Sequence, residues 1–194
     1  MAQIVSFEDH ALSRLRDRLG AAESARADLL AFAHGHSAAS AAIHEAVLLA
    51  LRADSAEALV ASVVADWPLL LGVDCAVLCL AAGPSGVRID RAASGPLDPT
   101  LLARGIPGIA LTRSVERGHP LFGGAAAAIR AEALVPLRAP GLTGLLLLGQ
   151  EGEGAVAATD GAELLEFLGA ALGAMLGRWL TSPPAPSLRI PPAR

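Results

Sequence analysis

Few residues of this chain are of a type that could perform chemistry. Ser114 and His119 share one polar segment with Glu116, so a nucleophile, a base and an orienting acid lie close together in sequence. Such proximity is common in polar loops, and no oxyanion-hole motif accompanies it. A hydrolase is therefore only a minor hypothesis, and haem ligation by His119 has no better support. We predict that the protein is not an enzyme.

Metal and redox chemistry are also poorly supported. His34, His36 and His44 lie on a predicted helix, but no two of them have the four-residue spacing that presents two imidazoles to one ion. Cys75 and Cys79 lie on one face of a predicted strand, about 13 Å apart. A disulfide needs Cα atoms within about 7 Å. We expect two buried thiols, no metal and no cofactor.

The charge pattern excludes further classes. The sequence lacks lysine, which rules out a Walker phosphate loop, and no Gly-x-Gly-x-x-Gly segment joins a strand to a helix. The formal net charge is −4, so we expect neither nucleic acid nor an anionic membrane surface as a direct partner. Residues 1–10 lack the features of a signal peptide, and the apolar stretch 167–177 is too short to span a membrane. These features predict a cytoplasmic protein.

The composition is that of a folded chain. Of the 194 residues, 53% are hydrophobic and 18% are charged, which is enough apolar surface to offset chain entropy. The length fits one ordinary domain with an accessory element.

The accessory element is a predicted helical stalk over residues 1–53. From about Ser6 to Ala53, apolar residues recur with alternating spacings of three and four, as in a coiled-coil seam, with a break expected near Gly35. The stalk has few large apolar residues, so it needs a packing partner. A second copy of the chain is the partner we expect. The predicted dimer contacts along the seam are Leu12, Leu15, Leu19, Leu29 and Ile43.

A globular domain of helices and strands is expected over residues 54–180. A capping box at Asp54 and Glu57 opens a helix, and Asp98 caps a short one. Strands are predicted at 73–82, 87–91, 109–112, 133–138 and 143–149, and a short helix at 121–130. Two hairpins account for four of these strands, joined by a Gly-Pro-Ser-Gly turn and an Ala-Pro-Gly turn.

The last predicted helix runs from a second capping box, Asp160 with Glu163, to about Leu180. Gly169, Gly173 and Gly177 recur on one of its faces at four-residue spacing. Small residues let another helix approach closely, which predicts a second dimer contact, although drift in a glycine-rich sequence is an alternative. Residues 181–194 contain five prolines and are expected to be a disordered tail.

Several short blocks resemble domain-of-unknown-function family 484 of bacteria in content and order. The resemblance covers about residues 4–180, and the order of the blocks carries more weight than any single one. The sequence departs from the family at 150–153 and 155–161, which leaves the role of that loop open. The blocks are Val5-Ser6-Phe7, Leu15-Arg16, 43–48, 71–74, Leu121-Phe122-Gly123-Gly124, 133–137 and 144–149.

This resemblance implies an α+β fold: a GAF-like domain with a central antiparallel sheet flanked by helices, behind a long N-terminal helix that forms a dimeric coiled coil or bundle. It implies a sensor or protein-interaction module with no assigned reaction. Genes of the family often lie beside a tyrosine recombinase, which hints at a protein partner. We predict a non-enzymatic module that dimerises through its N-terminal and C-terminal helices.

The alternative is a small-molecule sensor with an enclosed pocket. In a GAF-like fold, the segment between the hairpins, about residues 105–130, would cover that pocket. Arg113 and Arg130 would then meet an anionic ligand, His119 would add a polar contact and Phe122 an apolar wall. The competing interpretation is that both arginines are surface residues and Phe122 belongs to the core.

Overall fold

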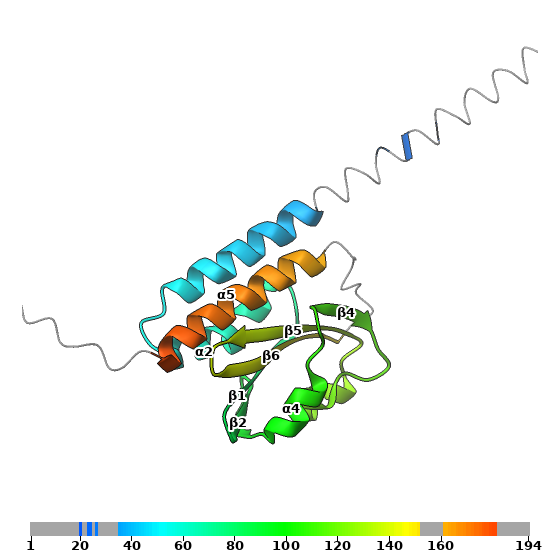
Figure 1. Cartoon of the computed structure of the whole chain (residues 1–194). Coiled ribbons are helices and arrows are strands. Elements are labelled where there is room, and N and C mark those ends of the chain that lie inside the picture. Colours follow the sequence, from blue (N-terminus) through cyan, green and yellow to red (C-terminus); the bar gives the residue numbers. More distant parts are fainter. Residues whose placement is uncertain (1–19, 21–22, 25, 27–34, 152–160, 182–194) are drawn as a thin grey trace, which may run out of the picture. The chain divides into compact units, whose positions relative to one another are not determined.

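The computed structural model describes residues 20, 23–24, 26, 35–151 and 161–181 (Figure 1). The chain divides into two compact units, 1–40 and 41–194. In the first unit the described residues, 35–40 among them, are helical. The predicted seam residues Leu12, Leu15, Leu19 and Leu29 lie outside the described residues, as do Asp160 and the tail from 182 onward.

The second unit is built on one six-stranded antiparallel sheet. Its strand order is β3-β2-β1-β6-β5-β4, so the three most apolar strands lie at or next to the centre. Both predicted hairpins are present: β1 pairs with β2, and β5 pairs with β6. The strands are β1 (Cys75–Ala82), β2 (Ser85–Ile89), β3 (Ser94–Pro96), β4 (Leu111–Ser114), β5 (Ala131–Ala139) and β6 (Leu142–Gln150).

Turn chemistry sets the two hairpins. Gly83 and Gly141 have φ angles of 58° and 75°, a region that glycine enters without steric cost. The edge strands were predicted less well. No sequence pattern predicts β3, and β4 begins and ends two residues later than the predicted strand 109–112. Both edge strands are short and largely exposed, so they lack the alternating apolar pattern that identifies a strand.

One face of the sheet is covered by a layer of helices. This layer consists of helical residues 41–51, α2 (Ala56–Ala65), α3 (Trp67–Leu71) and α5 (Gly161–Thr181). Trp67, Leu59, Leu168 and Leu172 are fully buried between this layer and the sheet. Burial of side chains this large supplies much of the free energy of folding.

Ile43 belongs to this core. It is only 5% exposed and packs in one cluster with Ala46 and Ala50 and with residues of the sheet and α5. The apolar seam of helix 41–51 therefore packs against the sheet and α5 of its own chain. The contact of Ile43 with a second copy stays a prediction.

The start of α2 differs in detail from the predicted capping box. Ser55, not Asp54, is the N-cap, and its hydroxyl oxygen accepts a hydrogen bond from the backbone N–H of Ala58 at 3.0 Å. Helix α2 ends at Ala65, and Pro68 follows in the next helix. It lies in the first turn of α3, where the missing N–H has no helical partner to lose.

The three glycines of α5 lie against a strand of the same chain. A Cβ at Gly169 would come within 2.7 Å of the Pro136 carbonyl oxygen, and one at Gly177 within 2.6 Å of the Ala139 Cβ. A Cβ at Gly173 would be 3.0 Å from the Arg138 carbonyl oxygen. The close neighbour is thus β5 and not the expected helix. The glycines are buried by this contact and are turned away from the outer surface of the layer.

The other face of the sheet is covered by α4 (Pro99–Gly105) and the 3₁₀ segment η1 (Pro120–Ala127). Asp98 caps α4 as predicted, accepting a hydrogen bond from the Thr100 N–H at 2.8 Å. The predicted helix 121–130 is instead a shorter 3₁₀ segment, interrupted at Gly123, whose φ is 63°. We call this side of the sheet the η1 face.

Candidate functional site

The η1 face is the side on which the sequence places a ligand pocket, and it is filled by the chain itself. Phe122 is 1% exposed, and Leu102 and Ile129 are fully buried against strand residues such as Leu147. Gly149 of β6 lies beneath them: a Cβ there would be 2.6 Å from Ile129 Cδ1 and 2.8 Å from Phe122 Cε1. Phe122 is therefore a core residue, not the wall of an open pocket.

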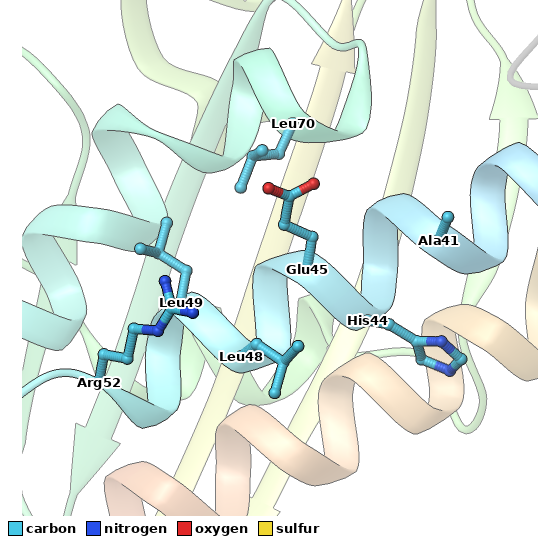
Figure 2. A pocket seen from close by; sticks show the side chains of 7 residues that line it. All are labelled: Ala41, His44, Glu45, Leu48, Leu49, Arg52 and Leu70. Atoms are coloured by element: carbon cyan, nitrogen blue, oxygen red, sulfur yellow. The ribbon is translucent and has the colours of Figure 1, made fainter.

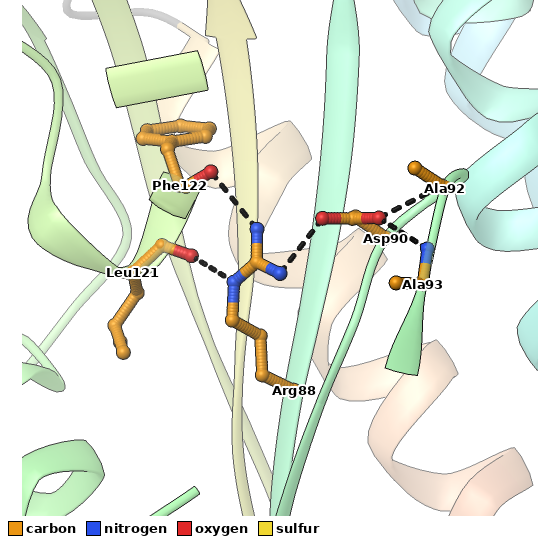
Figure 3. A network of polar contacts seen from close by, with 6 residues as sticks. All are labelled: Arg88, Asp90, Ala92, Ala93, Leu121 and Phe122. Carbon is orange, nitrogen blue, oxygen red and sulfur yellow. Dashed lines mark hydrogen bonds and ion pairs between the residues drawn. The ribbon is translucent and has the colours of Figure 1, made fainter. Parts of the chain in front are cut away.

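Arg88 of β2 ties η1 to the sheet (Figure 3). Its Nε donates to the Leu121 carbonyl oxygen at 2.6 Å, and one terminal nitrogen donates to the Phe122 carbonyl oxygen at 2.9 Å. The other terminal nitrogen pairs with Asp90 at 2.7 Å. Asp90 in turn accepts hydrogen bonds from the N–H groups of Ala92 and Ala93. One guanidinium thus donates to two carbonyl groups of η1 and also holds a carboxylate of the sheet side.

Glu132 of β5 is the second polar centre on the η1 face. Its side chain is fully buried, although it lies near the start of a strand whose next five residues are all apolar. One carboxylate oxygen receives Arg113 of β4, whose Nε and terminal nitrogen both lie at 2.7 Å. The other oxygen accepts a hydrogen bond from the backbone N–H of His119 at 2.6 Å. Both oxygens are satisfied, as a buried carboxylate requires.

The predicted ligand residues are only partly brought together. Arg113 and His119 meet at Glu132, so these two do share one site. Arg130 is exposed and donates to the carbonyl oxygens of Ala127 and Ile129, its own neighbours in sequence. The Arg113 guanidinium already holds a carboxylate. Ligand binding by these residues stays a prediction.

Sequence reasoning missed both polar centres, Arg88 and Glu132. Arg88 alternates with apolar residues in its strand, a pattern that is typical of a solvent-facing side chain. Glu132 is a single acid inside an apolar run. The signal that could have found them is an isolated charge within a predicted strand of the core. Because burial of an unpaired charge is costly, such a residue is expected to have a polar partner.

The hydrolase hypothesis gains no support from this geometry. The Nδ1 atom of His119 accepts a hydrogen bond from the Leu121 N–H at 3.2 Å and is not directed to a hydroxyl. No hydrogen bond joins Ser114 to His119 in the described part of the chain, and Ser114 lies on the exposed edge strand β4.

The two cysteines lie on β1, as predicted, and both are free thiols. Burial raises the pKa of Cys79 to about 11, against a smaller lowering by the nearby Arg88 charge. Burial likewise raises the pKa of Cys75 to about 11. Both thiols are therefore protonated at neutral pH and are poor nucleophiles. Within the described residues, acidic, histidine and cysteine side chains do not gather into a group of three or more that could hold a metal ion.

A groove lies on the outer side of the helical layer, away from the sheet (Figure 2). It has a volume of about 480 Å³ and is lined by helix 41–52 on one side and by Leu70 of α3 on the other. Its lining combines exposed leucine, Glu45 and Arg52.

No described helix has both the length and the apolar character that crossing a bilayer demands.

Family membership follows from the match of the whole chain. The family described as "Protein of unknown function, DUF484" matches residues 1–181. The chain belongs to this family. None of the curated proteins matches this DUF484 chain in sequence. The expected resemblance is thus confirmed over nearly the full length of the protein.

Solved structures confirm the fold class of this DUF484 protein. The GAF domain of A. aeolicus nlh2 in an inactive state is 13% identical, with a TM-score of 0.55, covering 72% of this chain and 96% of that one. The free methionine-R-sulfoxide reductase of Neisseria meningitidis, solved with its substrate, is 18% identical with a TM-score of 0.51, covering 72% and 89%. At these identities the likeness establishes a GAF-like α+β fold.

Acid should destabilise this DUF484 protein through His119. Burial lowers the pKa of His119 below 6.5, outweighing the opposing effect of the Glu132 charge, while the Arg113 charge adds to the lowering. The unfolded chain then binds the proton more readily. The free energy of unfolding should therefore be highest above pH 6.5 and should fall as the pH drops from there to the pKa of the folded protein.

Urea unfolding of the wild type and of His119→Gln at pH 7.5 and pH 5.5 measures this effect. The wild type should lose more stability on acidification than the variant does. His44→Gln serves as the control, because that ring is exposed on helix 41–51, and it should lose as much as the wild type. Equal losses in the wild type and His119→Gln would contradict the assignment.

Proposed function

We propose that this protein is a cytoplasmic, non-enzymatic GAF-like module that acts through protein interaction and dimerises through its N-terminal helix and α5. The single observation that carries the proposal is the packing of large apolar side chains over the η1 face. Phe122, Leu102 and Ile129 fill the space over the sheet, and Arg88 fixes η1 in place. The helical layer, in contrast, leaves large apolar side chains on its outer surface, among them Leu48, Leu51 and Phe167.

Exposed apolar side chains on neighbouring helices are typical of interaction surfaces. The His44 and Phe167 rings meet edge to face, with centroids 6.1 Å apart, so helix 41–51 and α5 form one continuous surface. Sedimentation equilibrium of the full chain at tens of micromolar tests the proposal. The expected result is a dimer, and a monomer at these concentrations would refute it.

A small-molecule sensor is the second candidate. The observation in its favour is that Arg113, His119 and Glu132 meet at one end of the η1 face. A thermal-shift screen of nucleotides and anionic metabolites, run in parallel on the wild type and on Arg113→Met, tests this candidate. A ligand that stabilises the wild type by several degrees and Arg113→Met much less would favour it. Equal shifts would place the ligand elsewhere.

A further inference from the structure

The outer surface of the helical layer carries an apolar strip between opposite charges. On helix 41–51, Leu48 and Leu51 are each 55% exposed. On α5, Phe167 is 47% exposed, and Ala170 and Ala174 continue the exposed stripe toward the C-terminus. We call these five residues the outer strip. Figure 1 shows the two helices side by side and running in the same direction.

Acidic residues lie at the N-terminal end of the strip and basic residues at its C-terminal end. Glu45 comes before Leu48 in the chain, and Arg52 comes after it, about two helical turns beyond Glu45. Glu45 and Arg52 both line the groove of Figure 2. On α5, exposed Glu163 and Arg178 flank Phe167 in the same order. In the described part of the chain none of these four charged groups forms an ion pair. The Arg178 guanidinium lies over the Trp179 ring, 5.5 Å from its centroid, a contact that leaves its positive charge without a carboxylate.

The two helices share one centre of charge symmetry. The midpoint between Glu45 and Arg52 lies at Leu48 and Leu49, and the midpoint between Glu163 and Arg178 lies at Ala170 and Ala171. His44 contacts Phe167, so these two residues lie at the same level along the two parallel helices. Counted from this level, the two midpoints lie within about one residue of each other along the helix axes. A two-fold axis across the helices at this level would place Glu45 opposite Arg52 and Glu163 opposite Arg178.

We infer that the outer strip is the contact surface for a second copy of this chain, packed antiparallel about that axis. Helix 41–51 then lies against its own copy, with Glu45 opposite Arg52 of the partner subunit, and α5 against its copy, with Glu163 opposite Arg178 of the partner subunit. This inference rests on the proposed dimer and adds its surface and orientation. Self-complementary charges are the property that an isologous interface requires and that an unrelated partner does not.

A parallel arrangement does not use these charges. If helix 41–51 met its own copy in parallel, Glu45 would face Glu45 of the partner subunit. If it met α5 in parallel, the same register would place Glu45 level with Phe167 and Leu168, and Arg52 level with Ala174 and Met175, where no charge lies. Only the antiparallel orientation matches each charge with its opposite.

Charge reversal tests the orientation. The dimer dissociation constant of the full chain is measured by sedimentation equilibrium in 50 mM salt for Glu45→Arg, for Arg52→Glu and for the double variant. Each single variant creates two like-charge contacts and should weaken the dimer about tenfold. The double variant restores both pairs and should bind within about twofold of the wild type. Glu116→Arg, an exposed charge on the loop after β4, is the matched control and should bind like the wild type.

The outcomes separate this inference from the proposed function. If all four variants dimerise like the wild type, the antiparallel orientation is wrong although the dimer stands. Leu48→Asp tests the surface itself and should weaken the dimer at least as much as a single reversal. A dimer that resists Leu48→Asp but is lost on Leu15→Asp would place the contact in the N-terminal segment and overturn the inference. Circular dichroism confirms that these exposed substitutions leave the fold intact.

Discussion

Arg88→Ala should lower the free energy of unfolding by about 3 kcal/mol. The variant loses two hydrogen bonds to the carbonyl oxygens of Leu121 and Phe122 and the ion pair with Asp90. The larger part of the cost comes from the lost guanidinium bonds to these two carbonyl groups, which lie near the core. Urea denaturation followed by circular dichroism measures the change.

Arg91→Ala is the matched control for this variant. Arg91 is exposed three residues further along the same connection, and its removal should change stability by less than about 0.5 kcal/mol. Arg88→Lys should recover only part of the loss, because an ammonium group cannot reach three acceptors in the fixed geometry of a guanidinium. If Arg88→Ala were as stable as Arg91→Ala, η1 would not depend on this tether.

Gly169→Ala should also be destabilising, by about 2 kcal/mol, although alanine is the better helix former by about 1 kcal/mol. The added Cβ would lie 2.7 Å from both the Pro136 carbonyl oxygen and Val135 Cγ1. Contacts this short force α5 away from β5, and the strand backbone cannot move without disturbing its pairing with β6. Thermal unfolding should show a clear decrease in midpoint temperature, and Gly169→Val should lower it further.

Gly161→Ala provides the comparison within the same helix. A Cβ at Gly161 meets no other atom within 4 Å, so helix propensity alone should act and stability should stay level or rise. Opposite signs for the two substitutions are the expected result. A stabilising Gly169→Ala would mean that the glycines of α5 are not there for the close contact with β5.

Much of the fold could be predicted because its signals are local. The Gly-Pro-Ser-Gly and Ala-Pro-Gly turns fixed both hairpins, and Asp98 before Pro99 fixed the start of α4. Each of these features depends on a few consecutive residues whose backbone preferences agree with the final structure. The edge strands β3 and β4 escaped prediction or were shifted, since exposed strands of three or four residues have no apolar alternation.

The candidate site was predictable only in part. The sequence indicated which segment covers the sheet, and Arg113 and His119 do lie together. It gave no reason to choose Arg88 or Glu132, because their importance comes from what they meet. Arg88 meets carbonyl groups of η1, and Glu132 meets the Arg113 guanidinium directly opposite it on the neighbouring strand β4. Such contacts join residues distant in sequence, so no local pattern records them.

The sequence alone determined that this chain folds as an α+β domain of a recognisable family, lacks a Walker loop and carries a helix rich in small residues at its end. The tertiary structure decided what those features meet. The seam of helix 41–51 turns inward to the sheet, the glycines of α5 contact β5, and Phe122 occupies the space where a ligand was considered. The periodicity of the sequence shows which side of a helix is apolar. Which surface that side packs against depends on all the apolar surfaces of the chain, and these meet only in the tertiary structure.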